Sequence, residues 1–201
     1  MGVLERRQRQ KEEVRNSILT AAWQQVLAEG WASLSIRKIA DAIEYSVPVI
    51  YSHFVSKDAI LLEFTRQGFQ RLLEQMQQQA ICDKAPAEQL QGIAQAYWTF
   101  AFENREYYQL MFGLGIPTCD AANHIAELRL FSDFVRHPIE QLLATGPNVD
   151  ADPYLKFRTF WSILHGLVSI QMIDGQSSKT DNYCQLILQD AITGFIKSLT
   201  Y

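Results

Sequence analysis

The stretch that decides the fold reads SIRKIADAIEYSVPVIYSHF and spans residues 35–54. Apolar residues at steps of three and four predict one short helix over 35–43 and a second over 47–53. Helices this short are marginal in isolation, so they must be held by packing against each other and their neighbours. Ala40 is small enough to let the second helix cross close over the first. Two helices that cross steeply through a short turn form a helix-turn-helix, whose second helix can enter the DNA major groove.

Both predicted helices begin at residues that suit a helix start. Ser35 and Ser46 stand at the N-terminal cap positions, where a serine oxygen can accept a hydrogen bond from the first turn. Pro48 falls in the first turn of the second helix, where its missing N–H costs no intrahelical hydrogen bond. Ile50 and Phe54 form the predicted inward face of that helix.

Helical periodicity also dominates the rest of the chain, and strand-like alternation is absent at any useful length. Gly and Pro mostly fall between the periodic segments. We therefore predict an all-α fold of about nine helices. The predicted ranges are 6–29, 35–43, 47–53, 57–80, 87–103, 105–112, 119–144, 153–173 and 180–199. Pro138 lies inside one of these ranges and should kink that helix.

Composition limits the class of protein. The chain has 201 residues, 48% of them apolar, and a formal net charge of −4 at pH 7. A chain of this length can bury a sizeable core, and its three cysteines lack the CxxC spacing of a structural zinc site. The charged N-terminus does not resemble a signal peptide, and the longest apolar region, 159–173, is too short to span a membrane. We expect a cytoplasmic protein with no membrane partner.

The charges are unevenly distributed along the chain. Residues 1–57 contain 8 basic and 6 acidic residues, whereas the remainder contains 10 and 16. A mildly basic first part permits a nucleic-acid partner at one end of the molecule. The same numbers would also fit an ordinary enzyme, so charge alone decides nothing.

From about residue 10 to residue 64 the chain resembles the DNA-binding domain of the TetR/AcrR family of bacterial transcriptional regulators. Two further stretches are similar to C-terminal ligand-binding domains found in part of that family. The matching stretches are AEGW (28–31), SIRKIADAI (35–43), YSHF (51–54), SKDAILLEF (56–64), ENREYYQLMFG (103–113) and LHGLVSI (164–170). The resemblance implies an N-terminal three-helix DNA-binding domain with a basic arm over 1–56. It also implies a C-terminal effector-binding and dimerisation domain over 57–201.

The resemblance also implies which residues contact DNA, and the chain departs from the family pattern at two places. Glu44 replaces the usual glycine of the turn, and a positive φ is sterically costly for a glutamate. The second helix also lacks the basic residue that the family often carries at its start. We therefore expect affinity to come largely from phosphate contacts, with apolar contacts to thymine methyl groups. The candidate DNA contacts are Ser35, Arg37, Ser46, Val47, Val49, Tyr51, Ser52, His53 and Lys57.

The basic residues at the N-terminus allow two interpretations. Arg6, Arg7, Arg9 and Lys11 form either a flexible arm that reaches an adjacent minor groove or a disordered tail of mixed charge. Similarly, Tyr51 either touches phosphate or only packs.

The last two predicted helices carry more apolar surface than one buried face needs. Helix 153–173 is apolar nearly all round, and helix 180–199 has two apolar stripes. A helix buried on two sides in a chain of this size implies a partner, so we predict a twofold dimer joined by a four-helix bundle. One stripe comprises Leu188, Ile192, Phe195 and Leu199. The candidate dimer contacts are Tyr154, Phe157, Leu164, Leu167, Ile187, Ala191 and Gly194.

Aromatic and sulfur-containing side chains crowd the middle helices. They form either an ordinary core or the walls of an apolar cavity that binds a small effector, with a few polar anchors. The candidate effector contacts are Trp98, Phe102, Met111, Phe112, His124, Phe131, Trp161 and His165.

These observations predict a TetR-type regulator rather than an enzyme. The chain lacks GxSxG, HExxH, P-loop and GxGxxG motifs, its four histidines are scattered, and the pair Cys119 and His124 is too weak a signal for a metal site. We expect no cofactor and no metal. The predicted function is a repressor that binds a palindromic double-stranded DNA operator as a homodimer and is released by a small apolar or amphipathic effector.

The alternative is that the C-terminal domain docks a protein partner instead of a small molecule. A cavity of roughly 300–1,000 Å³ would favour the effector. A filled core with an exposed apolar patch would favour the partner.

Overall fold

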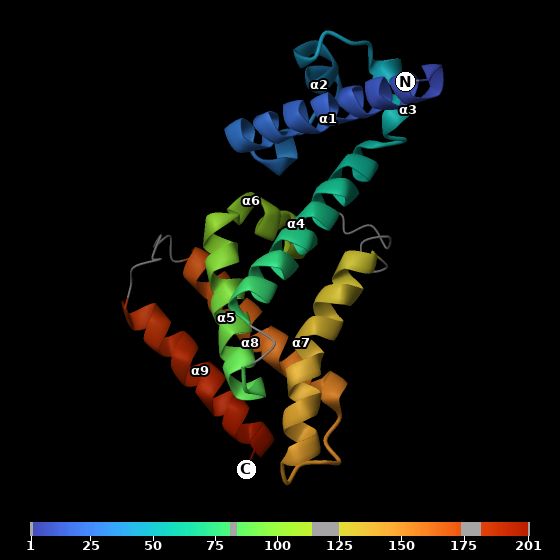
Figure 1. Ribbon diagram of the computed structural model, residues 1–201. Helices are drawn as coiled ribbons and strands as arrows, with labels where there is room; N and C mark the ends of the chain where they lie inside the picture. Colours follow the sequence, from blue (N-terminus) through green and yellow to red (C-terminus); the bar gives the residue numbers. More distant parts are fainter. Residues whose placement is uncertain (1, 81–83, 114–124, 174–181, 201) are drawn as a thin grey trace.

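The computed structural model describes residues 2–80, 84–113, 125–173 and 182–200 (Figure 1). Every regular element within these ranges is helical, which confirms the all-α prediction. The elements are α1 (Val3–Glu29), the 3₁₀ helix η1 (Trp31–Ser33), α2 (Ile36–Ala42), α3 (Val47–His53), α4 (Lys57–Gln79), α5 (Pro86–Glu103), α6 (Arg105–Phe112), α7 (Ala126–Thr145), α8 (Pro153–Ile173) and α9 (Asn182–Thr200).

One local expectation was wrong, and one short element was not expected. The helix expected from residue 119 begins at Ala126, because Ile125 has an extended backbone and acts as its N-terminal cap; residues 119–124 lie outside the described ranges. The 3₁₀ turn Trp31–Ser33 was not expected, because three residues are too few to show a periodic pattern. Gly30 caps the C-terminal end of α1 and takes φ +77°, which favours glycine.

The helices form two groups joined by α4. Figure 1 shows α1, α2 and α3 together at one end, with α4 leading from them into the group formed by α5 to α9. Within that group α4 packs against α5, α6 and α7, and α8 packs against α5, α7 and α9. The buried apolar side chains run continuously from Ile18 in α1 to Leu199 in α9.

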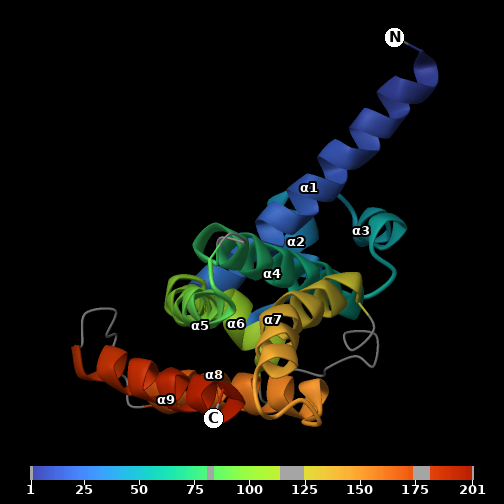
Figure 2. The same cartoon turned by 60° about the horizontal axis from the view of Figure 1, so that its bottom comes forward.

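Helix α7 is bent. Pro138 lies inside it, and proline has no N–H to donate to the preceding turn. Figure 2 shows that α7 changes direction along its length, as the proline predicts.

The two faces of α9 have different surroundings. Leu188, Ile192 and Leu199 are buried within the chain, whereas Tyr183 and Ile187 are 70% and 40% exposed. One apolar stripe therefore belongs to the core of the chain and the other lies on its surface. No helix in the described part of the chain is both long and apolar enough to cross a bilayer.

Candidate DNA-binding surface and effector site

The start of α2 is fixed by a glutamine from α1. The Gln25 side-chain oxygen accepts a hydrogen bond from the Ser35 N–H at 3.1 Å, and its nitrogen donates to the Ser33 carbonyl at 2.7 Å. The Ser35 hydroxyl in turn accepts from the Lys38 N–H at 3.5 Å, so it caps the helix as expected. These bonds orient α2 relative to α1.

The turn between α2 and α3 has the strained backbone that Glu44 predicts. Glu44 takes φ +59°, and the adjacent Tyr45 N–H donates to the Ala40 carbonyl at 3.0 Å. Ala40 and Ile50 are almost completely buried, so the two helices pack closely. The turn therefore keeps the geometry of a helix-turn-helix without glycine.

Ser46 does not cap α3 with its side chain, contrary to expectation. It occupies the cap position, but its hydroxyl makes no capping hydrogen bond. Pro48 at the second helical position has no N–H to offer, and the Val49 N–H donates to the Ser46 backbone carbonyl at 2.9 Å. Both donors that a capping side chain would need are therefore missing or engaged.

The outward face of α3 carries polar groups. Tyr51 is 48% exposed, and the exposed Ser52 hydroxyl donates to the Val49 carbonyl at 2.7 Å. Val49 is half-buried, and Val47 packs partly against the core, which leaves less of the valine surface for thymine contacts than Tyr51 and Ser52 offer. Arg37 on α2 is exposed as well.

Cations from α1 surround the end of α3. Burial lowers the pKa of His53, and the charges of Lys11 and Arg15 lower that pKa further. Arg15 also lies 4.7 Å above the Phe54 ring and forms an ion pair with Glu63 of α4 at 2.8 Å. A neutral His53 flanked by cations suits an anionic partner.

The N-terminal basic residues are helical rather than a flexible arm or a disordered tail. Arg6, Arg7, Arg9 and Lys11 are exposed residues of α1, which begins at Val3.

The start of α4 has a cap that sequence reasoning missed. The Ser56 hydroxyl accepts from the Ala59 N–H at 3.1 Å, and Lys57 is the first helical residue. A serine followed by a charged first turn is an ordinary helix-start signal and would have identified it. The free N–H groups of this turn and the Lys57 charge favour a phosphate.

An aromatic cluster joins α1 to α6. Trp23 stacks on Tyr107 with ring centroids 4.3 Å apart, and Trp31 meets Phe64 of α4 at 5.6 Å. The Trp31 indole N–H donates to the backbone carbonyl of Glu106 at 2.8 Å. This direct link between the helix-turn-helix end and α6 was not predicted, because its partners lie far apart in sequence.

Two adjacent tyrosines of α6 contact different parts of the molecule. Tyr107 faces α1, whereas the Tyr108 hydroxyl lies 2.7 Å from His165 Nδ1 on α8 and 3.3 Å from the hydroxyl of Tyr97 on α5. Burial raises the pKa of Tyr108 to about 12 and raises that of Tyr97 well above its ordinary value. Burial also lowers the pKa of His165, so all three groups are neutral near pH 7.

A hollow of about 280 Å³ lies beside this network. Three of the predicted effector contacts line it, together with Arg158 and Ser162, which were not predicted. The lining residues are Phe112, Arg158, Trp161, Ser162 and His165.

The other predicted effector contacts do not line this hollow. Trp98 packs against Phe102 at 5.0 Å, and Phe131 is buried against Phe69 and Phe157. Met111 lies against Gly68, where a side chain on residue 68 would collide with its sulfur. His124 lies outside the described residues.

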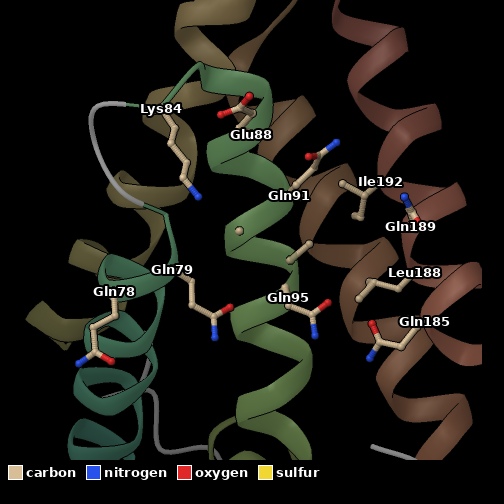
Figure 3. A pocket seen from close by; sticks show the side chains of 12 residues that line it. Gln78, Gln79, Lys84, Glu88, Gln91, Gln95, Gln185, Leu188, Gln189 and Ile192 are labelled. Atoms are coloured by element: carbon tan, nitrogen blue, oxygen red, sulfur yellow. The ribbon is translucent and has the colours of Figure 1, made fainter. Parts of the chain in front are cut away.

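A larger groove of about 770 Å³ lies elsewhere, between α4, α5 and α9 (Figure 3). Glutamine side chains dominate it, so it does not match the expected apolar cavity. Gly92 allows the close approach of α5 to the end of α4, since an added Cβ would lie 2.8 Å from the Gln79 carbonyl oxygen. The glutamines are Gln78, Gln79, Gln91, Gln95, Gln185 and Gln189.

The predicted dimer contacts divide between surface and core. Phe157 and Leu164 are each only 2% exposed, so they belong to the core of the chain, and the prediction that they contact a partner was wrong. Helix α8 is apolar nearly all round, and its sequence therefore does not distinguish the two sides. Tyr154 is 56% exposed, while Leu167 and Ala191 are half-buried.

Other apolar residues take the surface positions. Leu155 and Ile170 on α8 are each 61% exposed, and Leu186 on α9 is 59% exposed. A Cβ added at Gly166 or Gly194 would meet open space, so both glycines lie where a second backbone could approach closely. Within the described ranges no group of three or more metal-binding side chains occurs.

Two family models match the chain. One, described as bacterial regulatory proteins of the tetR family, matches residues 18–64. The other, described as a tetracyclin repressor-like C-terminal domain, matches residues 90–189. No curated protein matches the sequence significantly.

Solved structures share the fold at low sequence identity. A protein of unknown function from Rhodococcus sp. RHA1 has a TM-score of 0.74 and 20% identity, covering 93% of this chain and 95% of that one. The TetR family transcriptional regulator PfmR from Thermus thermophilus has a TM-score of 0.64 and 19% identity, with coverages of 90% and 97%. The fatty acid degradation regulator FadR from Bacillus halodurans has a TM-score of 0.67 and 15% identity, with coverages of 92% and 93%.

Proposed function

Since the chain belongs to the TetR family of bacterial transcriptional regulators, we propose that it is a homodimeric repressor that binds a palindromic operator and is released by a small effector. We assign residues 1–56 to DNA binding and residues 57–201 to effector binding and dimerisation. Such a regulator acts on the chromosome, in the cytoplasm. Family members are generally DNA-binding proteins rather than enzymes.

The observation that carries the DNA-binding proposal is the geometry of α3. Its inward residue Ile50 is fully buried, while Tyr51 and Ser52 are exposed and cations of α1 lie near His53. We assign phosphate contacts to Tyr51, His53 and Lys57, and base contacts to Ser52 and Val49. Most of the affinity then comes from phosphates.

The exposed apolar stripe supports the dimer. Leu155, Ile170 and Leu186 would otherwise lie in water, and the open positions at Gly166 and Gly194 suit helices that pack closely. A twofold dimer presents two α3 helices to one operator. Their half-sites would lie one helical turn apart, about 34–36 Å, or a multiple of it.

The aromatic link between α6 and α1 supports a route from effector to DNA. A ligand beside Phe112 and Tyr108 would act on α6, whose Glu106 carbonyl is bonded to Trp31. The effector must bind one arrangement of α6 better than the other, or no shift results. Helix α4 carries the same change, because Phe64 packs in the same cluster.

One observation favours the alternative in which the C-terminal domain docks a protein partner. The hollow of about 280 Å³ is at the lower limit of ordinary ligand pockets, which measure roughly 300–1,000 Å³. A protein ligand would then cover exposed apolar residues. Dimerisation through the same stripe would leave less surface for such a partner.

A binding selection on genomic fragments tests the proposed function. Purified protein should enrich palindromic sites, and its affinity for them should fall steeply with salt, with a log–log slope of roughly −0.9 for each phosphate neutralised. Failure to enrich any site would contradict DNA regulation by this chain. Enrichment of single half-sites would contradict the dimer alone.

A further inference from the structure

The polar groups that line the hollow beside α6 are almost all hydrogen-bond donors. Arg158 donates only, and Ser162 can donate through its hydroxyl. His165 Nδ1 is engaged by the Tyr108 hydroxyl at 2.7 Å. No acidic side chain is among the residues that line the hollow.

The tyrosine network engages one nitrogen of His165. The Tyr97 hydroxyl donates to the Tyr108 oxygen at 3.3 Å, and the hydroxyls of Tyr108 and Tyr97 lie 2.7 Å and 3.4 Å from His165 Nδ1. When a tyrosine hydroxyl donates to Nδ1, the hydrogen of the neutral imidazole lies on Nε2. In this tautomer His165 offers a donor through Nε2.

Arg158 is an exposed cation that forms no ion pair among the described residues. Its guanidinium lies 4.9 Å above the Trp161 ring. Residues 58–201 are acidic overall, with 10 basic and 16 acidic side chains. A cation beside a hollow that no acidic side chain lines favours an anion.

The remaining walls are aromatic. Phe112 lies 5.8 Å from Trp161 and 5.5 Å from the His165 ring, measured between ring centroids. A flat apolar group can lie against these rings, while Arg158 and His165 reach its polar end. The volume of about 280 Å³ admits a body of one or two rings, or a short acyl chain.

We propose that the effector is a small organic anion, a carboxylate on an apolar body, held by Arg158 with the His165 Nε2–H as second donor. This inference rests on the proposed function and names the chemical class of its effector. The carboxylate replaces the missing counter-ion of Arg158, and the apolar body contacts Phe112 and Trp161.

Three probes that share one ring system and differ in charge test this inference. They are 2-naphthoate, 2-naphthamide and 2-naphthylmethylamine, titrated calorimetrically into the full-length protein. We expect naphthoate to bind at least tenfold more tightly than either of the others. Equal or tighter binding of the amide or the amine would overturn the anion assignment, and so would the failure of all three to bind.

Variants of one arginine assign the preference to this site. Arg158→Gln should abolish the preference for naphthoate and leave the affinity for naphthamide unchanged. Arg158→Lys keeps a cation and should therefore retain part of the preference. Arg129→Gln, which removes an exposed arginine from α7, should have no effect. A preference that survives Arg158→Gln would overturn the assignment. Arg158 is exposed, so these changes should not impair folding.

A measurement of operator binding distinguishes failure of this inference from failure of the proposed function. Naphthoate should lower operator affinity in the wild type and not in Arg158→Gln. If a neutral or cationic compound releases the operator instead, the anion class is wrong and effector-controlled DNA binding stands. If the protein binds no operator at all, the proposed function fails whatever the probes show.

Discussion

The α2–α3 region and the hollow beside α6 present their binding groups in opposite ways. Around the turn, a few buried apolar residues such as Ile39 and Ile50 hold the helices, and the binding side chains point into solvent. Beside α6, the polar groups Tyr97, Tyr108 and His165 are buried or half-buried and hold one another. Substitutions on the outer face of α3 should therefore change binding alone. Substitutions of the buried polar groups beside α6 should change binding and folding together, whereas those of the exposed Arg158 should change binding alone.

The largest effect tests the exposed region. The double variant Tyr51→Ala and Lys57→Ala should lose operator affinity by roughly 100-fold or more, because two backbone contacts are removed. Helix content and dimer mass should not change. Arg66→Ala, which removes an exposed cation further along α4, is the matched control, and the affinities are measured by fluorescence anisotropy. Retained affinity in the double variant would refute the contact assignment.

The next effect tests the outward stripe of α8 and α9. Leu186→Glu should raise the dimer dissociation constant by roughly 100-fold, because it buries an unpaired charge in the interface. Leu130→Glu on α7 is the control, since Leu130 and Leu186 are 56% and 59% exposed. Sedimentation velocity gives the masses. Equal behaviour of the two variants would show that the dimer forms elsewhere.

A smaller effect tests the link between the two regions. Trp31→Phe keeps an aromatic ring beside Phe64 but removes the hydrogen bond to the Glu106 carbonyl, at a cost of about 1 kcal/mol in unfolding free energy. Denaturant unfolding measures that cost. The factor by which the effector weakens operator binding should shrink. An unchanged factor would show that coupling runs through other contacts.

The turn should tolerate, and gain from, a glycine. Glu44→Gly relieves a positive φ at the expense of a more flexible unfolded chain, so we expect stabilisation of less than about 1 kcal/mol. Glu44→Ala keeps the strain and should not stabilise. Thermal unfolding of both variants checks this. A destabilised glycine variant would mean that the Glu44 side chain itself holds the turn.

The smallest effect is a pH dependence from the hollow. Burial holds the pKa of folded His165 below its ordinary value of 6.5, so the unfolded chain takes up the proton first. Stability should be complete above pH 6.5 and should fall as the pH drops from there towards the folded pKa. His165→Gln should flatten part of this loss, whereas the exposed His137→Gln should not. His53→Gln should flatten a further part, because its pKa is also lowered.

Much of the fold could be predicted from sequence because the signals for each helix, its apolar spacing and its end residues, lie within the helix itself. The short helices ending at Ala42 and His53 follow from apolar spacing, and the strained turn at Glu44 follows from the family pattern. The inner side of α8 could not be predicted, since Phe157 and Ile170 are equally apolar and only packing separates them.

The site was harder to predict than the fold. Phe112, Trp161 and His165 line one hollow. Trp98 and Phe131 are aromatic residues of the same kind in the sequence, but they pack in the core. The importance of Arg158 depends on having no acidic partner, and a missing partner is a property of three-dimensional packing.

The most direct test of the account is the affinity for a selected operator before and after about five base pairs, half a helical turn, are inserted at its centre. A rigid dimer with both α3 helices on one face of DNA should lose roughly 100-fold or more in affinity, because the insertion rotates one half-site to the opposite face. Equal affinity for the two sites would contradict the account, since the two heads would then bind independently of the α8–α9 dimer.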